Sequence, residues 1–387
     1  MKNHSKEIAV LFTSLFLVMV GFGIIIPLLP FFVVHLNGSP TALGFLMASY
    51  SLMQFFFAPM WGRLSDRIGR RPVLLIGLSG YGITFIMFGL STHLWMLFAA
   101  RLLSGMISSA TLPTAMAYIA DITDSENRAG GMGIMGAAMG LGMIFGPAMG
   151  GWLGHYGFSM PFFVAGGLAL LTLPFAYFLL PESLSPGGQP RSTGRKLSLD
   201  VFKNPQFPLF ALAFIVSFTM AMFESTFALF AAARVGFGPR EMGIFFTILG
   251  VLSVAIQAGL IGRLVKSFGD ARVIISGIAI SILGFLLLLA APSVAALVAF
   301  ACVFSAGNSL LRPSVSSLVT KTAGDGQGAS VGIMQSFDSL GRILGPITGG
   351  AFFDLSANMP YLLGAVVLTV TLTAARKRLK QYAHTTA

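Results

Sequence analysis

Four charged residues lie inside long apolar stretches, where a charge is costly and usually functional: Arg101, Glu224, Asp338 and Arg342. Glu224 lies in the run 220–227, which consists mostly of Met, Phe and Ala residues, and an apolar setting favours the neutral form of a carboxyl. We therefore expect Glu224 to take up and release a proton. Asp338 and Arg342 are four residues apart, the spacing at which opposite charges pair on one helix face. One interpretation is a structural ion pair between the two side chains. The alternative is that Asp338 is a second protonation site and releases Arg342 when it becomes protonated.

The amino-acid composition indicates the kind of protein in which these charges lie. Charged residues make up 10% of the 387 residues and hydrophobic residues 55%, with a mean hydropathy of +0.85. Globular domains are about 25% charged, and a soluble chain this apolar would lack the polar surface to cover itself. The sequence therefore predicts an all-α integral membrane protein with the lipid bilayer as its surroundings. The net charge of +11 comes from basic residues in short loops, so we expect no nucleic-acid partner.

A membrane-spanning helix needs about 20 mostly apolar residues, and this rule predicts twelve transmembrane helices. We expect an N-terminal six-helix lobe at 1–181, a cytoplasmic linker at 182–206 and a C-terminal six-helix lobe at 207–387. The predicted spans are 8–34, 41–61, 73–91, 94–117, 129–152, 159–181, 207–233, 241–262, 273–291, 294–317, 327–350 and 360–376.

The distribution of basic residues predicts the orientation. Of the 24 lysines and arginines, only Arg234 and Arg240 fall in loops on the predicted outer side. Lysine and arginine collect in cytoplasmic loops. We therefore expect both termini in the cytoplasm and a multi-pass protein of the cell membrane.

The two halves share motifs that are 199 or 200 positions apart. A charged loop at 62–72 returns at 262–272, where Lys266 replaces the aspartate of the first copy, and Pro113 returns as Pro313. The run 146–151 likewise returns at 345–350. Repeats of this parallel kind are typical of two-lobed transporters with a site between the lobes at the membrane midplane.

At these motifs the sequence resembles the major facilitator superfamily. The likeness rests on the loop 62–72, on 97–110 in the fourth span, on 140–151 in the fifth and on 21–30 in the first. Within that superfamily it is similar to the twelve-span drug:proton antiporters, and among them to bacterial quinolone and multidrug exporters, through Arg312-Pro313, 324–328 and Gly345-Pro346.

The resemblance implies a secondary active transporter and not an enzyme. Such a protein exports hydrophobic or cationic drugs in exchange for protons by alternating access, with the proton gradient as energy source and no cofactor. A dedicated exporter of one endogenous metabolite, such as a siderophore, a sugar or a lipid precursor, stays open as the alternative. We expect a monomer, and the five histidines fall in predicted loops or tails, which indicates no metal site.

The resemblance also implies a gate, in which Asp66 docks on the start of the eleventh helix near 327–330. Asp121 would share the arginines of the loop. Without a gating role, the arginines would only anchor the loop on the inner side. The expected gating residues are Gly62, Asp66, Arg67, Gly69, Arg70, Arg71 and Asp121.

Three residues of the spans take their roles from the same resemblance. Glu224 falls where the resembling exporters carry a glutamate in the seventh helix. Arg101 matches a residue proposed to assist proton transfer, and its alternative role is to donate hydrogen bonds to carbonyl groups. Where those exporters can carry an acid in the tenth helix, this chain has Asn308, so Asp338 would have to supply a second acid.

Small residues and prolines of the fifth and eleventh spans predict either tight helix packing or a bend that lets the two mouths open in turn. These hinge or interface candidates are Gly146, Pro147, Gly150, Gly345, Pro346 and Gly349. Flexible and aromatic side chains, with a few polar ones, are expected to contact substrate. These candidates are Gln54, Met139, Met220, Phe223, Glu224, Asn308 and Gln335.

Overall fold

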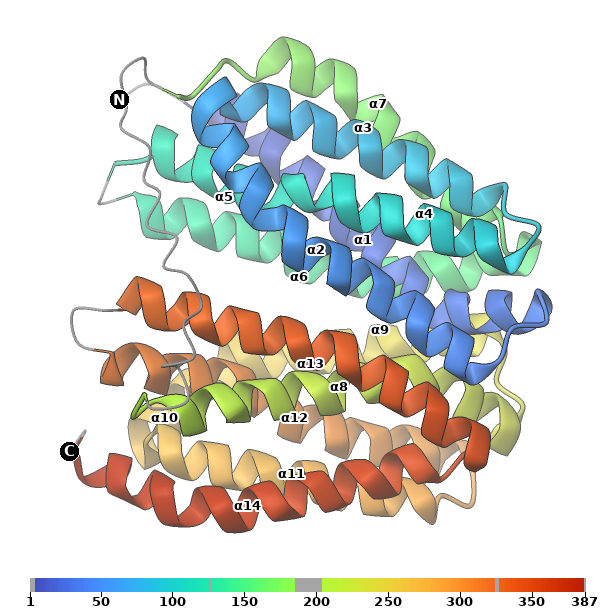
Figure 1. Cartoon of the computed structure of the whole chain (residues 1–387), viewed down its shortest axis with the longest axis vertical. Helices are drawn as coiled ribbons and strands as arrows, with labels where there is room; N and C mark the ends of the chain where they lie inside the picture. The colour runs from blue at the N-terminus through green and yellow to red at the C-terminus, as the bar shows by residue number, and fades with distance from the viewer. Residues whose placement is uncertain (1–3, 125–126, 185–203, 324–326, 386–387) are drawn as a thin grey trace. The chain divides into compact units, whose positions relative to one another are not determined.

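The structure, a computed structural model, describes residues 4–124, 127–184, 204–323 and 327–385, with side chains up to residue 376. Most of the predicted linker lies outside the described residues, as does part of the motif at 324–328. Helices are the only regular secondary structure in the described ranges (Figure 1). The prediction of an all-helical fold is confirmed.

Each predicted span of the first half overlaps a helix. Pro113 lacks a backbone N–H and so interrupts the helix ladder one turn earlier. The predicted span 94–117 is accordingly divided by a 3₁₀ turn at Ser108–Ala110. The helices are α1 (Ser5–His35), α2 (Pro40–Ile68), α3 (Arg70–Gly89), α4 (Leu94–Ile107), α5 (Thr111–Ile122), α6 (Arg128–Leu153) and α7 (Met160–Leu179).

The second half repeats this order. A π-helical turn at Ile256–Leu260 joins α9 to α10, and Pro313 lies inside an unbroken α12. The helices are α8 (Phe207–Val235), α9 (Pro239–Ala255), α10 (Ile261–Phe268), α11 (Asp270–Leu289), α12 (Val294–Thr322), α13 (Gln327–Leu355) and α14 (Met359–Thr385).

Eleven helical stretches of the described residues are long and apolar enough to cross a membrane. The predicted span 327–350 also forms a helix, α13, but it does not meet the same hydropathy criterion. Several glycines and serines, together with Asp338 and Arg342, make this helix more polar than a typical span.

The predicted loops at 62–72 and 262–272 were wrong, because both segments are almost entirely helical. α2 continues to Ile68 and α3 begins at Arg70, so that only Gly69 separates them. Gly69 has a φ of +107°, and Gly269 in the second copy has +79°. Glycine adopts such positive φ values at no steric cost. A single glycine therefore breaks the helix in each half, and the charged residues belong to the adjoining helical turns.

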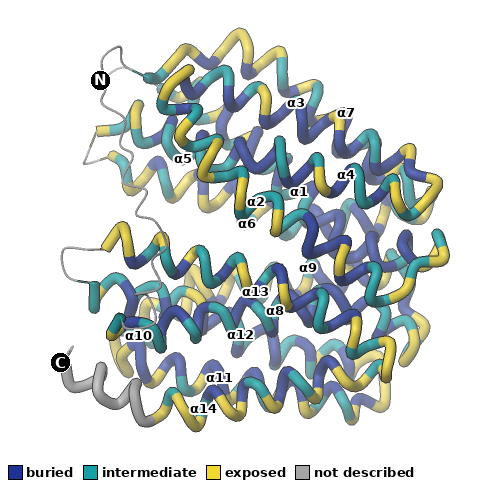
Figure 2. Tube along the Cα trace, viewed as in Figure 1, coloured by how far each residue is buried: buried dark blue, intermediate teal, exposed yellow. Residues whose placement is uncertain are grey.

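The same helix pairings occur in both halves. α1 packs against α6 and α7, and α3 packs against α4 and α7. In the second half α8 packs against α13 and α14, and α11 against α12 and α14. Buried residues lie where these helices face one another, and exposed residues lie on their outward sides (Figure 2).

The chain forms two compact units. One contains α1, α2 from Ser49 onward, α3 to α7 and the residues Gly238–Thr247. The other contains Ser39–Ala48, α8, the chain from Ile248 to the end of α9, and α10 to α14. The candidate residues are therefore described below within the unit to which each belongs.

Candidate functional site

Glu224 lies in the middle of α8 and is partly exposed. Arg342 on α13 and Arg312 on α12 are close enough for their charges to act on its carboxyl group. The residues on either side, Phe223 and Ser225, are buried. A single acidic group is thus held within an apolar helix, with two cations from neighbouring helices near it.

Asp338 on α13 is 2% exposed. Its Oδ1 accepts a hydrogen bond of 2.7 Å from the Ser217 hydroxyl on α8, and its Oδ2 lies 3.7 Å from Nη2 of Arg312. We expected Arg342 as the partner, and the structure adds these two contacts from other helices. A cavity of about 10 Å³ adjoins Asp338 and Arg312, near the smallest volume that holds one water.

Two acids and two arginines of α8, α12 and α13 therefore lie in one region of the second unit. We call this set, Glu224, Arg312, Asp338 and Arg342, the acid–arginine cluster. The sequence pointed to three of its members as charges within apolar spans. Arg312 falls inside the predicted span 294–317 but was named only as part of the Arg312-Pro313 motif, and Ser217 carries no charge that would single it out.

Arg101 on α4 is 2% exposed, and its guanidinium carbon lies 4.7 Å from the centre of the Tyr50 ring. Its Nε and Nη1 have no hydrogen-bond partner among the described residues. The alternative role, hydrogen bonding to carbonyl groups, is therefore not fulfilled by these two nitrogens. A cation held by an aromatic face keeps its remaining donors available.

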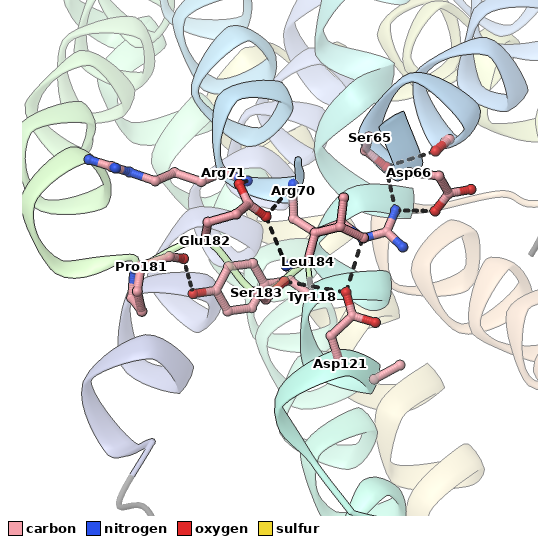
Figure 3. A network of polar contacts seen from close by, with 12 residues as sticks. Ser65, Asp66, Arg70, Arg71, Tyr118, Asp121, Pro181, Glu182, Ser183 and Leu184 are labelled. Atoms are coloured by element: carbon pink, nitrogen blue, oxygen red, sulfur yellow. Dashed lines mark hydrogen bonds and ion pairs between the residues drawn. The ribbon is translucent and has the colours of Figure 1, made fainter. Parts of the chain in front are cut away.

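At the turn between α2 and α3, Arg70 joins two carboxylates (Figure 3). Its Nη1 lies 2.6 Å from Oδ1 of Asp66 and donates a 2.6 Å hydrogen bond to Ser65, while its Nε lies 3.1 Å from Oδ2 of Asp121. Arg70 is buried although it belongs to a strongly charged segment. This geometry links the end of α2 to the end of α5, and the docking of Asp66 on the eleventh span stays a prediction.

The other residues of this turn have separate environments. Arg71 lies over the Tyr177 ring at 4.7 Å and donates to the Tyr177 carbonyl, whereas Arg67 is exposed. A Cβ placed on Gly62 would meet nothing within 4 Å, so this structure does not explain the glycine by close packing. Gly69 is explained by its positive φ and by the Glu182 carboxylate next to it.

The second half has an ion pair at the corresponding place with the charges reversed. Arg70 and Asp121 in the first half correspond to Asp270 and Lys321, each two hundred positions later. Nζ of Lys321 lies 2.6 Å from Oδ2 of Asp270, which is buried at the start of α11. Our sequence analysis missed this pair, although the offset between the repeats would have revealed it.

The proposed substrate contacts occupy different settings. Phe223 is 1% exposed and packs against the rings of Phe227 and Phe304, with ring centres 4.7 Å apart in both cases. Nδ2 of Asn308 is buried and has no hydrogen-bond partner in the described ranges. The remaining candidates are partly exposed (Gln54, Met139 and Met220) or exposed (Gln335).

The proposed hinge residues pack within their own units. A Cβ on Gly146 or Gly150 would press on α1, and one on Gly345 or Gly349 would press on α8. Pro147 and Pro346 lie inside α6 and α13. The residues described here contain no group of three or more His, Cys, Asp or Glu side chains that could hold a metal ion.

Comparisons with known proteins agree with these features. The family model described as Major Facilitator Superfamily matches residues 11–260 and 210–383. "Multidrug resistance protein 2" of Bacillus subtilis (strain 168) is 34% identical over 384 residues, which cover 96% of this chain and 94% of that protein. "Quinolone resistance protein NorA" of Staphylococcus aureus is 28% identical over 388 residues, covering 97% and 99%.

Among solved structures, that of the nucleoside transporter NupG superposes with a TM-score of 0.83 at 17% sequence identity, covering 97% of this chain and 99% of that one. At this level of identity the superposition shows the fold alone. The apolar helices and the family match make the chain a multi-pass membrane protein. The chain belongs to the major facilitator superfamily.

Proposed function

We propose that this chain is a secondary active transporter that exports hydrophobic or cationic drugs in exchange for protons. One observation carries the proposal: a carboxyl, Glu224, lies within an apolar helix near two arginines, in a chain whose full-length relatives are named for multidrug and quinolone resistance. Ionisable groups inside a membrane span mark substrate and proton pathways.

We infer twelve spans in two six-helix lobes, with both termini in the cytoplasm of a bacterial cell. Eleven apolar stretches and the more polar α13 support the number of spans. The distribution of lysine and arginine supports the orientation. The lobes would comprise 1–181 and 207–387, joined by 182–206, and no cofactor or second copy of the chain is needed.

Coupling would follow from the protonation of Glu224. In its ionised form the carboxylate attracts a cationic substrate, and a bound proton removes that attraction. A proton arriving from outside therefore displaces the substrate, and its release to the cytoplasm resets the site. Asp338 supplies a second acid, and the Arg312 and Arg342 charges set how readily the cluster accepts a proton. Arg101, whose Nε and Nη1 have no partner in the described part of the chain, assists proton movement in the first lobe.

The gate would consist of the contacts around Arg70. When the inner side is closed, Asp66 adds its charge to the positive end of α13, an interaction worth up to about 2 kcal/mol when partly buried. Opening of the inner side breaks this contact and leaves Asp66 paired with Arg70 alone. The glycines and prolines of α6 and α13 would let these two helices bend as the lobes rock.

The test uses purified protein in liposomes with an acidic lumen and a cationic fluorescent dye outside. We expect the dye to accumulate only while the pH gradient persists, and a protonophore should abolish the accumulation. If the folded protein moves no dye under these conditions, the drug-export proposal fails. The single-metabolite exporter would then be the function to examine.

A further inference from the structure

Glu182 lies three residues beyond Leu179, the last residue of α7, and its carboxylate reaches back to the start of α3 (Figure 3). Oε1 accepts a hydrogen bond of 2.8 Å from the Arg70 backbone N–H, and Oε2 accepts one of 3.1 Å from that of Arg71. The contact thus joins residues that are 112 positions apart in the chain.

α3 depends on this distant carboxylate for its cap. The first backbone N–H groups of a helix have no partner within the helix, and the preceding residue, Gly69, has no side chain to supply one. The two residues that open α3 are cations, which are unfavourable at the positive end of a helix. The Glu182 carboxylate accepts hydrogen bonds from the free N–H groups and places a negative charge beside the two cations.

The second half shows why the carboxylate is needed. There the ion pair is reversed, so α11 begins with Asp270 and carries its own acid at the helix start. In the first half a cation, Arg70, occupies that place, and the acid comes from Glu182. Glu182 therefore supplies the negative charge at the helix start that Asp270 supplies in the second half and that Arg70 cannot supply in the first.

The segment around Glu182, residues 181–184, is held at further points. The Tyr118 hydroxyl donates a 2.6 Å hydrogen bond to the Pro181 carbonyl. The Ser183 hydroxyl donates to Oδ2 of Asp121 at 3.3 Å, the same oxygen that Nε of Arg70 contacts. The segment thus contacts the start of α3 and the end of α5, the elements that Arg70 links.

We propose that Glu182 is a positioning residue of the gate, which fixes the first turn of α3 so that Arg70 joins Asp66 to Asp121. The inference builds on the proposed function, in which this network controls access from the inner side. Without the cap the first turn of α3 loosens, and the Arg70 guanidinium loses its fixed distance to Asp121 on α5.

The test compares amide hydrogen exchange, read by mass spectrometry, in the purified full-length protein and its variants. Glu182→Gln keeps the side-chain length but removes the charge and one acceptor oxygen. A matched control is Glu241→Gln, since the Glu241 carboxylate accepts a 2.9 Å hydrogen bond from the Gly238 N–H at the start of α9. Glu182→Asp retains a carboxylate.

We expect Glu182→Gln to raise exchange in the first turn of α3 about fivefold, the effect of losing a typical helix cap. Exchange at the end of α5 should rise with it, Glu182→Asp should lie nearer the wild type, and Glu241→Gln should change neither segment. The effect on α5 should disappear in the Asp121→Asn background, because the link through Asp121 is then already broken.

Two results would overturn the inference. One is unchanged exchange in α3 on Glu182→Gln, and the other is a change in α3 that never reaches α5, which would make Glu182 only a local cap. The hydrogen-exchange measurement does not depend on transport, so it tests the role of Glu182 even if the wild-type protein moves no dye. Where dye accumulates, Glu182→Gln should also slow it, and Glu182→Asp should restore most of the rate.

Discussion

At the scale of single residues, the buried carboxylate of Asp338 depends on two unlike contacts. A buried charge is stable only when it is paired or hydrogen-bonded. Ser217 supplies a short and buried hydrogen bond, whereas the Arg312 side chain is 59% exposed and lies 3.7 Å away. Exposed ion pairs contribute little, so the hydroxyl should stabilise Asp338 more than the guanidinium does.

Replacing Ser217 by alanine should therefore lower the free energy of unfolding by about 1.5–3 kcal/mol, the value of a hydrogen bond to a charged group. Thermal unfolding of the purified protein in detergent measures the change. The control is Ser339→Ala, because the Ser339 hydroxyl bonds only the Gln335 carbonyl of its own helix. Equal changes in unfolding temperature for the two variants would show that the hydrogen bond to Asp338 adds no more stability than a bond within one helix.

Some members of this site were visible in the sequence and others were not. Charges within apolar runs are rare, so Glu224, Asp338 and Arg342 stood out without any structural information. The partners of Asp338 depend on how α8 and α12 are rotated toward α13. That rotation is set by side-chain packing between helices distant in the chain, and a serine such as Ser217 looks like any other in the sequence.

At the scale of elements, the pairs α1 with α6 and α8 with α13 are packed closely through glycine. In α13 the position of a Cβ on Gly345 lies 2.5 Å from the Phe218 carbonyl oxygen of α8. Small residues let helix backbones approach in a membrane, where association relies on van der Waals contact. The bending predicted for the prolines of these helices would act in addition to this packing.

Gly345→Ala should push α13 away from α8 and destabilise the protein by about 1–3 kcal/mol, the usual cost of overpacking. Gly332→Ala on the same helix is the matched control, because nothing lies within 4 Å of its added Cβ. Thermal unfolding of both variants gives the comparison. Loss of stability at Gly332 as large as at Gly345 would contradict the packing role.

The ion pair between Lys321 and Asp270 at the start of α11 gives a second prediction at this scale. Removal of the Lys321 charge by Lys321→Met leaves the buried Asp270 carboxylate without its cation at the start of α11. We expect a loss of about 1–3 kcal/mol in unfolding free energy, as for a buried polar group that loses its partner. Lys321→Arg should retain most of the stability, and similar losses in both variants would refute the pairing.

The helices themselves were largely predictable, because long apolar runs leave few alternatives in a membrane. Their ends were less so. Charged residues at 62–68 and 262–268 suggested loops, yet they continue the helices, since polar side chains can leave the apolar region while the backbone stays hydrogen-bonded. The cap of α3 by Glu182 joins distant segments, and no local pattern indicates it.

At the scale of the whole molecule, the two halves repeat one arrangement of helices but not one set of charges. Counting back 199 positions, Asp338 and Arg342 correspond to Met139 and Met143. The acid–arginine cluster therefore belongs to the second half alone. The first half instead has Arg101 and the Arg70 network. In the function proposed above, the second half binds the proton and the first half contributes to the gate.

The measurement that tests proton coupling most directly compares two transport modes of Glu224→Gln in liposomes. Gln resembles a permanently neutral Glu, so the variant cannot cycle a proton, whereas exchange of labelled for unlabelled substrate needs no change in protonation. We expect dye accumulation driven by a pH gradient to vanish, whereas exchange of an uncharged hydrophobic substrate, which does not depend on attraction by the carboxylate, should persist. Glu241→Gln, a carboxylate outside the cluster, should retain both. Gradient-driven accumulation by Glu224→Gln at the wild-type rate would contradict the role of Glu224 in coupling.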